Sequence, residues 1–165
     1  MIWDPSGTGQ FTAASAREVI RRQTNKVVWH KVVWFKGLVP RLAVILWMAY
    51  RRKMLTKDKL LAWGSVQEHR CVLCDSASEN INHLFFVCPF SNAIWEEILR
   101  RNNVHRGVEN WESESSKAID ETKGSDFVAK IRALSLAAAV YVIWKEIKEL
   151  SDFQAVQAEL AVYLV

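Results

Sequence analysis

The stretch CVLC at residues 71–74, with His83 after eight more residues and Cys88 after a further four, decides the fold of this chain. All three cysteines of the 165-residue chain lie in this window. Structural zinc sites use four Cys or His ligands in a tetrahedron, and a C-x-x-C turn can bring two thiolates to one ion. The spacing therefore predicts one structural Zn²⁺ per chain, with four ligands: Cys71, Cys74, His83 and Cys88.

These cysteines could also be ordinary core residues or a redox pair. Free cysteines are often buried without any ligand role, and a C-x-x-C pair can be a redox motif. The redox alternative lacks the βαβ pattern that is expected around residues 71–74. Unrelated core cysteines would rarely fall at ligand spacing beside a histidine. Of the remaining histidines, only His69 lies near enough in sequence to replace His83 as a ligand.

The composition is that of a chain that folds inside the cell. Half of the residues are hydrophobic and eight are Trp, whereas disordered chains are poor in aromatic residues. An odd number of cysteines and the lack of a signal-peptide pattern at residues 1–5 predict a cytoplasmic or nuclear location. The longest apolar run, residues 133–144, is too short for a membrane span, so no membrane partner is expected.

The net charge of +4 conceals an asymmetry between the two halves of the chain. Residues 1–70 hold 13 Lys/Arg and 4 Asp/Glu, a net charge of +9, whereas residues 71–165 hold 9 and 14, a net charge of −5. A basic half rich in Trp suits contact with RNA or DNA, although basic helix faces over a Trp-rich core would give the same composition. The candidate nucleic-acid-binding residues are Arg51, Arg52, Lys53, Lys57 and Lys59.

Hydrophobic periodicity predicts a mainly α protein. Helix caps are offered by Thr12 or Ser15, by Pro40 at a first helical position, and by Thr56 with Gly64 as a stop. The expected helices cover residues 12 or 15 to about 23, 27–35, 41 to about 53, a short segment from 56 to 64, a turn carrying His83, 89–101, a helix starting at 127, and 153–164.

These segments group into a small helical domain built around a zinc knuckle, followed by a C-terminal helical extension. The expected organisation is a flexible N-terminus at 1–10, a zinc-binding helical domain at 11–101, an acidic linker at 102–126 and a helical segment at 127–165. The linker prediction rests on the polar sequence ESESS at 112–116, where Trp111 is the one large apolar residue nearby.

The ordered motifs resemble the zinc-binding domain that follows the reverse transcriptase in plant non-LTR (LINE-like) retrotransposons. The specific part is the ligand set with its flank HLFF-x-CPFS at 83–91. Weaker landmarks are FT-x-x-SA at 11–16, LWMA at 46–49, LTKDKL at 55–60, WG at 63–64 and AA-x-Y-x-IWKE at 138–146. The sequence IKEL at 147–150 departs from the basic run that family members often carry there.

The resemblance implies a zinc-stabilised accessory module that binds RNA or DNA and could contact its parent reverse transcriptase polypeptide. No Tyr-x-Asp-Asp polymerase signature occurs in the chain, and four protein ligands would leave zinc no open position for substrate, so no catalytic activity is expected. The alternative is a protein-interaction module that docks on a polymerase or self-associates through the apolar helix at 127–146.

Overall fold

The computed structural model describes residues 9–21, 27–124 and 126–163, with side chains described up to Ser151 in the last helix. Within these ranges the chain forms helices and no β-strand, and one isolated bridge joins Arg70 to Ser78. The prediction of a mainly α protein is confirmed. The expected flexible N-terminus lies outside the described residues as far as residue 8.

The helices follow one another along the chain in a simple order. They are α1 (Ala13–Ile20), α2 (His30–Val33), α3 (Pro40–Tyr50), α4 (Lys57–Ala62), the π-helical turn η1 (His83–Val87), α5 (Pro89–Arg101), α6 (Trp111–Glu121) and α7 (Phe127–Tyr163).

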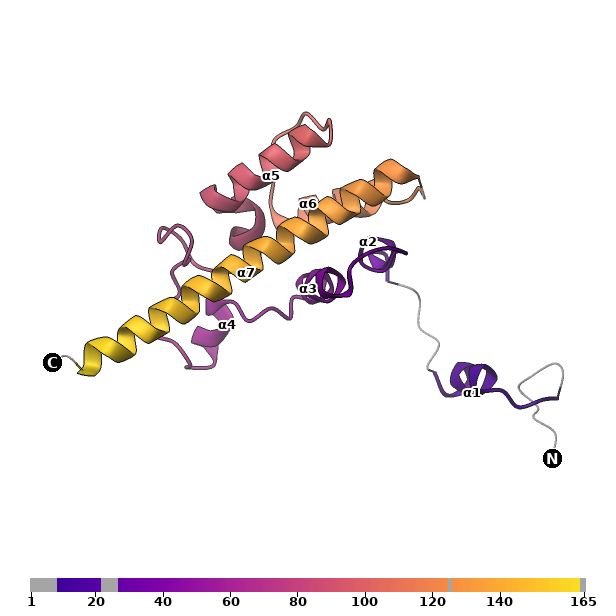
Figure 1. The fold of residues 1–165 in the computed structure, drawn as a ribbon, viewed down its shortest axis with the longest axis horizontal. Coiled ribbons are helices and arrows are strands. Elements are labelled where there is room, and N and C mark those ends of the chain that lie inside the picture. The colour runs from indigo at the N-terminus through magenta and orange to yellow at the C-terminus, as the bar shows by residue number, and fades with distance from the viewer. Residues whose placement is uncertain (1–8, 22–26, 125, 164–165) are drawn as a thin grey trace.

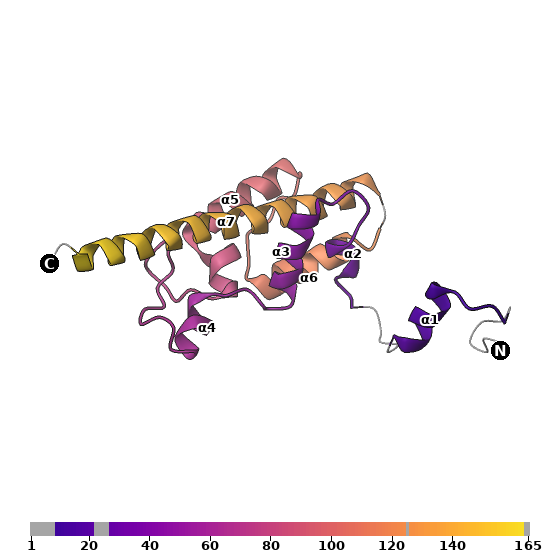
Figure 2. The same cartoon turned by 60° about the horizontal axis from the view of Figure 1, so that its bottom comes forward.

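The long helix α7 organises the fold, because α2, α3, α5, α6 and η1 all contact it. Figure 1 shows α7 running across the molecule, with α5 on one side of it and α3 on the other. Figure 2 shows α6 lying along the N-terminal half of the same helix. In both views α1 lies apart from the other helices, and it has no buried residue.

A single hydrophobic cluster joins residues of α2, α3, η1, α5, α6 and α7. Its fully buried members include Leu46 of α3, Phe85 and Phe86 of η1, and Ile143 of α7. Large apolar side chains from distant segments therefore bury one another, which is the main favourable term in folding. The metal-ligand segment and α7 share this core.

Local signals set several helix boundaries as predicted. Thr12 caps α1, and Ser15 is its capping partner, since the Ser15 N–H donates to Thr12 Oγ1 at 3.0 Å. Pro40 and Pro89 stand at the first positions of α3 and α5, where a missing N–H costs nothing. Gly64 ends α4 with a φ of 70°, which a side-chain-bearing residue adopts only at a cost.

Helix α3 ends earlier than the sequence predicted, at Tyr50 instead of about residue 53. Arg52 adopts a φ of 51°, and the N–H groups of Arg52 and Lys53 donate to the carbonyls of Ala49 and Met48. These two bonds form a Schellman cap, which satisfies carbonyls that the helix itself leaves unpaired. Arg52 and Lys53 thus belong to the cap that follows α3, and the helix stops at Tyr50.

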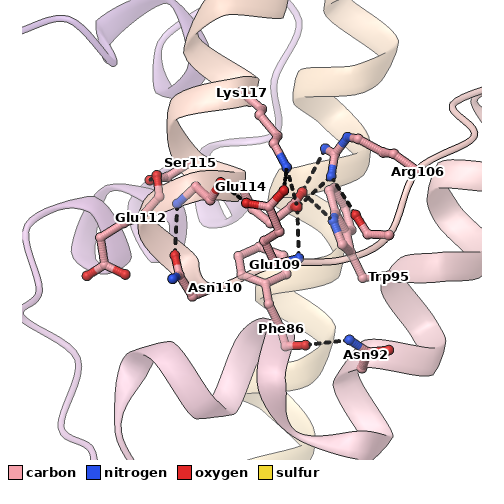
Figure 3. A network of polar contacts seen from close by, with 12 residues as sticks. Phe86, Asn92, Trp95, Arg106, Glu109, Asn110, Glu112, Glu114, Ser115 and Lys117 are labelled. Atoms are coloured by element: carbon pink, nitrogen blue, oxygen red, sulfur yellow. Dashed lines mark hydrogen bonds and ion pairs between the residues drawn. The ribbon is translucent and has the colours of Figure 1, made fainter.

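The prediction of an acidic linker at 102–126 is wrong for residues 111–121, which form α6. Asn110 caps this helix through its side chain, which accepts from the Ser113 N–H. Trp111 is buried, and the Glu114 carboxylate is fully buried beside Arg106 (Figure 3). A polar sequence can therefore be a packed helix when its few buried groups find partners elsewhere in the fold.

The C-terminal helix is longer than expected. The sequence predicts a separate helix at 153–164, but α7 continues without a break to Tyr163, and side chains after Ser151 lie outside the described residues. The segment Phe127–Ser151 is also long and apolar enough, by length and composition alone, to cross a membrane. An 18-residue apolar window of this segment is 44% buried inside the protein.

Candidate metal centre

The first two cysteines lie in a tight loop closed by backbone hydrogen bonds. The Cys71 N–H donates to the Ala77 carbonyl at 2.8 Å, and the Glu79 N–H donates to the His69 carbonyl at 2.7 Å. Within the loop the Asp75 N–H donates to the Cys71 carbonyl at 2.8 Å. This small ladder turns the chain back on itself, so that Cys71 and Cys74 face the same side.

The other two candidate ligands are placed by η1. The Asn80 side chain accepts from the His83 N–H at 3.0 Å, and the Cys88 N–H donates to the His83 carbonyl at 2.6 Å. In an α-helix, residues five apart point in different directions. The wider π-helical turn instead places residues i and i+5 one turn apart on the same side. The turn therefore points His83 and Cys88 toward a common centre, and Pro89 then starts α5.

All four ligand atoms lie within 4.8 Å of one another. The Cys71 and Cys88 sulfurs are 4.0 Å apart, and the Cys74 sulfur lies 3.2 Å from His83 Nε2. A tetrahedral zinc with ordinary bond lengths would separate its sulfurs by about 3.8 Å and a sulfur from a nitrogen by about 3.6 Å. The donor set therefore fits Zn²⁺, and changes of up to about 1 Å in the separations of the ligand atoms would give the spacing of a bound ion.

Backbone N–H groups surround the candidate sulfur ligands. Such donors favour a thiolate over a thiol and are expected around a metal-bound sulfur. The N–H groups that reach a cysteine sulfur are those of Leu73 and Cys74 to Cys71, Ser76 to Cys74, and Phe90 and Ser91 to Cys88.

The three thiols differ in acidity when no metal is bound. Burial raises the pKa of Cys71 to about 12 and also raises the pKa of Cys88. Burial acts in the same direction on Cys74, but hydrogen bonds from Ser76 and His83 outweigh it and lower the pKa of that thiol to about 6. Zinc binds thiolates, so metal binding at neutral pH must release the protons of Cys71 and Cys88.

Glu79 is a supporting residue whose role could not be recognised in the sequence. Its side chain is buried, and its two carboxylate oxygens accept from the Lys57 N–H at 3.1 Å and the Val72 N–H at 3.3 Å. Burial raises the pKa of this carboxyl, against the effect of the two N–H donors. Glu79 thereby joins the start of α4 to the C-x-x-C loop.

Ser76 is a second supporting residue, because its hydroxyl donates to the Cys74 sulfur at 3.2 Å. Neither Glu79 nor Ser76 belongs to a recognisable ligand pattern, since each acts through a neighbour. The one signal for them is their position between Cys74 and His83.

The basic residues singled out in the sequence are not equivalent in the structure. Arg52 forms an ion pair with Glu112 of α6, and the Lys59 ammonium donates to the carbonyls of Arg52 and Met54. These two cations therefore already have partners within the protein. The side chains of the other three form no ion pair within the described ranges: Arg51, Lys53 and Lys57.

Comparison with known proteins agrees with this geometry. Residues 11–95, just over half of the chain, match the family model described as zinc-binding in reverse transcriptase, and the match includes all four candidate ligands. No curated protein and no solved structure matches the chain. The family match and the Cys3His cluster together support a structural Zn²⁺ as its cofactor. The chain belongs to the family of zinc-binding domains in reverse transcriptase.

Proposed function

We propose that this protein is an accessory module of a retroelement reverse transcriptase that binds RNA or DNA and has no catalytic activity of its own. Its zinc is held by Cys71, Cys74, His83 and Cys88. The observation that carries the proposal is the closed set of four protein ligands, which leaves the metal a structural role. Zinc binding then contributes directly to the free energy of folding.

The same ligand set argues against catalysis. A catalytic zinc keeps one position for water or substrate, whereas four protein ligands fill the tetrahedron. The nearby carboxylate of Glu79 could serve as a base only if it were free. Both of its oxygens accept backbone N–H groups, and the side chain is buried.

Three cations near the α3–α4 connection support nucleic-acid binding. Arg51 and Lys53 are exposed and Lys57 is half-buried, and none of their side chains forms an ion pair in the described part of the chain. Cations without a protein partner can pair with phosphates and release the counterions bound to the nucleic acid. Arg52 and Lys59 are weaker candidates, because they already bind protein groups.

The test is the salt dependence of binding to RNA and DNA. If the three cations contact phosphates, a triple variant with Arg51→Gln, Lys53→Gln and Lys57→Gln should reduce the slope of log K against log[salt] by about 2 to 3. A matched control removes three charges that are paired in the fold: Arg100→Gln, Arg101→Gln and Lys145→Gln. Equal losses of affinity in both variants would show only a nonspecific effect of net charge.

We further propose that the parent element is a plant non-LTR retrotransposon and that the protein acts in the cytoplasm or nucleus beside its reverse transcriptase. The support is the set of motifs at residues 11–16, 46–49, 55–60 and 138–146 that flank the ligand pattern. Thiol ligands also suit a reducing compartment.

A second candidate function is protein interaction through α7. Phe127, Ile131 and Leu134 recur at helical spacing on this helix, and their exposed fractions are 76%, 39% and 41%. An apolar stripe of this kind is typical of surfaces that bind another protein. Sedimentation of the purified chain over a range of concentrations tests it, because self-association through the stripe should be abolished by Ile131→Glu. A monomer at all concentrations would rule out self-association.

A further inference from the structure

An open pocket of about 150 Å³ lies where α2 meets the start of α7, far in sequence from the metal ligands. Trp34 and Phe35 form one wall, and Ala129 and Ala133 of α7 form another. The pocket is lined mainly by apolar atoms. Its residues come from both the basic half of the chain and α7, so the pocket exists only in the folded protein.

Trp34 differs from the Trp residues of the core. Trp29 stacks on Tyr50, and Trp111 packs against the aromatic residues of η1. Trp34 is 53% exposed and makes no ring contact with another aromatic residue in the described ranges. Trp34 directly follows α2. The last two residues of that helix, Val32 and Val33, are fully buried and fix the position of Trp34. A large, half-exposed ring is thus held in the lining of the pocket.

Two lysines share this pocket with Trp34. Lys31 comes from α2 and Lys130 from α7, and both line the pocket. Neither side chain forms an ion pair or hydrogen bond in the part of the chain that the structure describes. No carboxylate is found among the described residues that line the pocket. The nearby Asp126 carboxylate accepts the Ala129 N–H at 3.1 Å and so serves as the cap of α7. The pocket therefore joins an apolar stacking surface to two cations without partners.

We propose that this pocket binds an unpaired base of single-stranded RNA or DNA, with the base stacked on Trp34 and the adjoining phosphates paired with Lys31 and Lys130. This inference rests on the proposed nucleic-acid binding and names the form of nucleic acid that binds. Every base has a face that can stack on an aromatic ring, so the pocket needs no particular sequence. A base inside a duplex is covered on both faces and cannot enter.

The experiment measures the affinity of the zinc-loaded full chain for a labelled 12-nucleotide RNA, the DNA of the same sequence, and the corresponding duplexes. Trp34→Ala should weaken single-strand binding by about tenfold to hundredfold, the usual effect of losing one stacked base. Duplex binding should change by less than twofold. Trp34→Phe keeps an aromatic ring and should retain most of the affinity. Lys31→Gln with Lys130→Gln should lower the salt dependence for single strands by about 1 to 1.5.

Trp63→Ala is the matched control, since Trp63 is 65% exposed and lies outside this pocket. Equal effects of Trp34→Ala and Trp63→Ala on single-strand binding would overturn the inference and leave nucleic-acid binding itself in place. The pocket would then be left to another occupant, such as an apolar side chain of a protein. Failure of the unaltered chain to bind any of the four nucleic acids would overturn both the inference and the proposed function. Circular dichroism of each variant confirms that its fold is intact.

Discussion

The zinc knuckle at residues 71–88 and helix α6 at Trp111–Glu121 are both short segments, yet different forces fix them in the fold. The knuckle is held by four ligand side chains that converge within 4.8 Å. Among the described residues, none of the candidate metal ligands lies in α6. This helix is instead fixed by the buried side chains of Trp111 and Glu114. The two segments therefore depend on different groups and should fail in different ways.

The buried side of α6 consists of an aromatic contact and an ionic one. The Trp111 ring lies 5.7 Å from Phe86 and 5.5 Å from Phe85, so α6 packs directly on the turn that carries His83. The Glu114 carboxylate accepts from Trp95 Nε1 at 2.9 Å and from Arg106 at 2.7 Å (Figure 3). The knuckle and α6 consequently touch at η1, although the zinc ligands and the buried side chains of α6 are different residues.

This difference explains why the knuckle can be predicted from the sequence and the packing of α6 cannot. Metal ligands must be Cys or His at short spacing, so the pattern is visible without knowledge of the fold. A buried Glu has no such signature, because its burial depends on partners that only the tertiary structure brings together. Substitutions in the two segments should separate the two kinds of stabilisation, and the largest effect is expected in the knuckle.

Replacing a zinc ligand should have that largest effect. Cys74→Ser is expected to lose most of the bound metal and to melt on the order of 10 °C lower, because the zinc-binding free energy is part of the folding free energy. Elemental analysis and thermal melting measure the two effects. Ser76→Ala is the graded control: it removes only the hydroxyl that donates to Cys74 and should keep the zinc with about tenfold weaker affinity. A Cys74→Ser protein with full zinc content would disprove the ligand assignment.

Removing the aromatic anchor of α6 should come second. Trp111 is 3% exposed, so Trp111→Ala should lower the free energy of unfolding by about 3–5 kcal/mol. The zinc content should stay at one per chain if the knuckle and α6 are held independently. Urea unfolding measures the loss, and the exposed Trp63→Ala should change it by less than about 0.5 kcal/mol. Loss of zinc in the Trp111 variant would show that the contact at η1 couples the two segments.

The buried carboxylate of α6 should give a smaller, pH-dependent effect. Burial raises the pKa of Glu114, but hydrogen bonds from Arg106 and Trp95 outweigh this and leave it below its usual 4.5. A carboxyl with a lowered folded pKa stabilises the protein above its unfolded pKa, and this stability is lost as the pH falls through the folded pKa. Glu114→Gln should therefore cost about 1.5–3 kcal/mol at neutral pH.

The difference in unfolding free energy between wild type and Glu114→Gln should shrink as the pH falls below about 4.5. Measuring the difference removes the contribution of acid-induced zinc release, which both proteins share. Glu97→Gln removes a carboxylate from a surface ion pair on α5 and should show no comparable loss at neutral pH. A difference that stays constant down to the acid limit would mean that Glu114 is not ionised in the folded protein.

The smallest effect is expected at the surface link between α3 and α6. Arg52 and Glu112 form an ion pair with side chains 48% and 52% exposed, so Arg52→Gln should cost less than about 1 kcal/mol. The difference should disappear at high salt, because exposed charges are screened. Arg51→Gln, which removes a neighbouring charge without an ion pair, should leave stability unchanged. Urea unfolding at low and high salt measures both variants.

The sequence predicted more of the knuckle than of its surroundings. Three helix boundaries and the ligand set depend on local chemistry. The structure confirms the helix starts at Pro40 and Pro89 and the end of α4 at Gly64. It also brings the four predicted ligands together. The residues that support the ligands escaped prediction. The supporting role of Glu79 depends on its hydrogen bonds to Lys57 and Val72, which lie 22 and 7 residues before it in the chain. Such a combination forms no pattern that can be recognised in the sequence.

The basic residues show the same limit. Arg51, Arg52, Lys53, Lys57 and Lys59 look alike in the sequence, and their role in nucleic-acid binding stays a prediction. In the folded protein Arg52 pairs with Glu112 of α6. The Lys59 ammonium donates to backbone carbonyls next to the cap of α3. Which cations stay available for phosphates is a property of packing, and composition alone cannot supply it.

By itself the sequence determined the helical character of the protein and the chemistry and spacing of its metal ligands, since both are governed by residues close together in the chain. Only the tertiary structure decided that residues 111–121 form a packed helix, that α7 contacts most of the other helices and that Trp34 and Lys130 line one pocket. These outcomes depend on desolvation and on partners from distant segments. The interactions that stabilise them form only when the chain has folded.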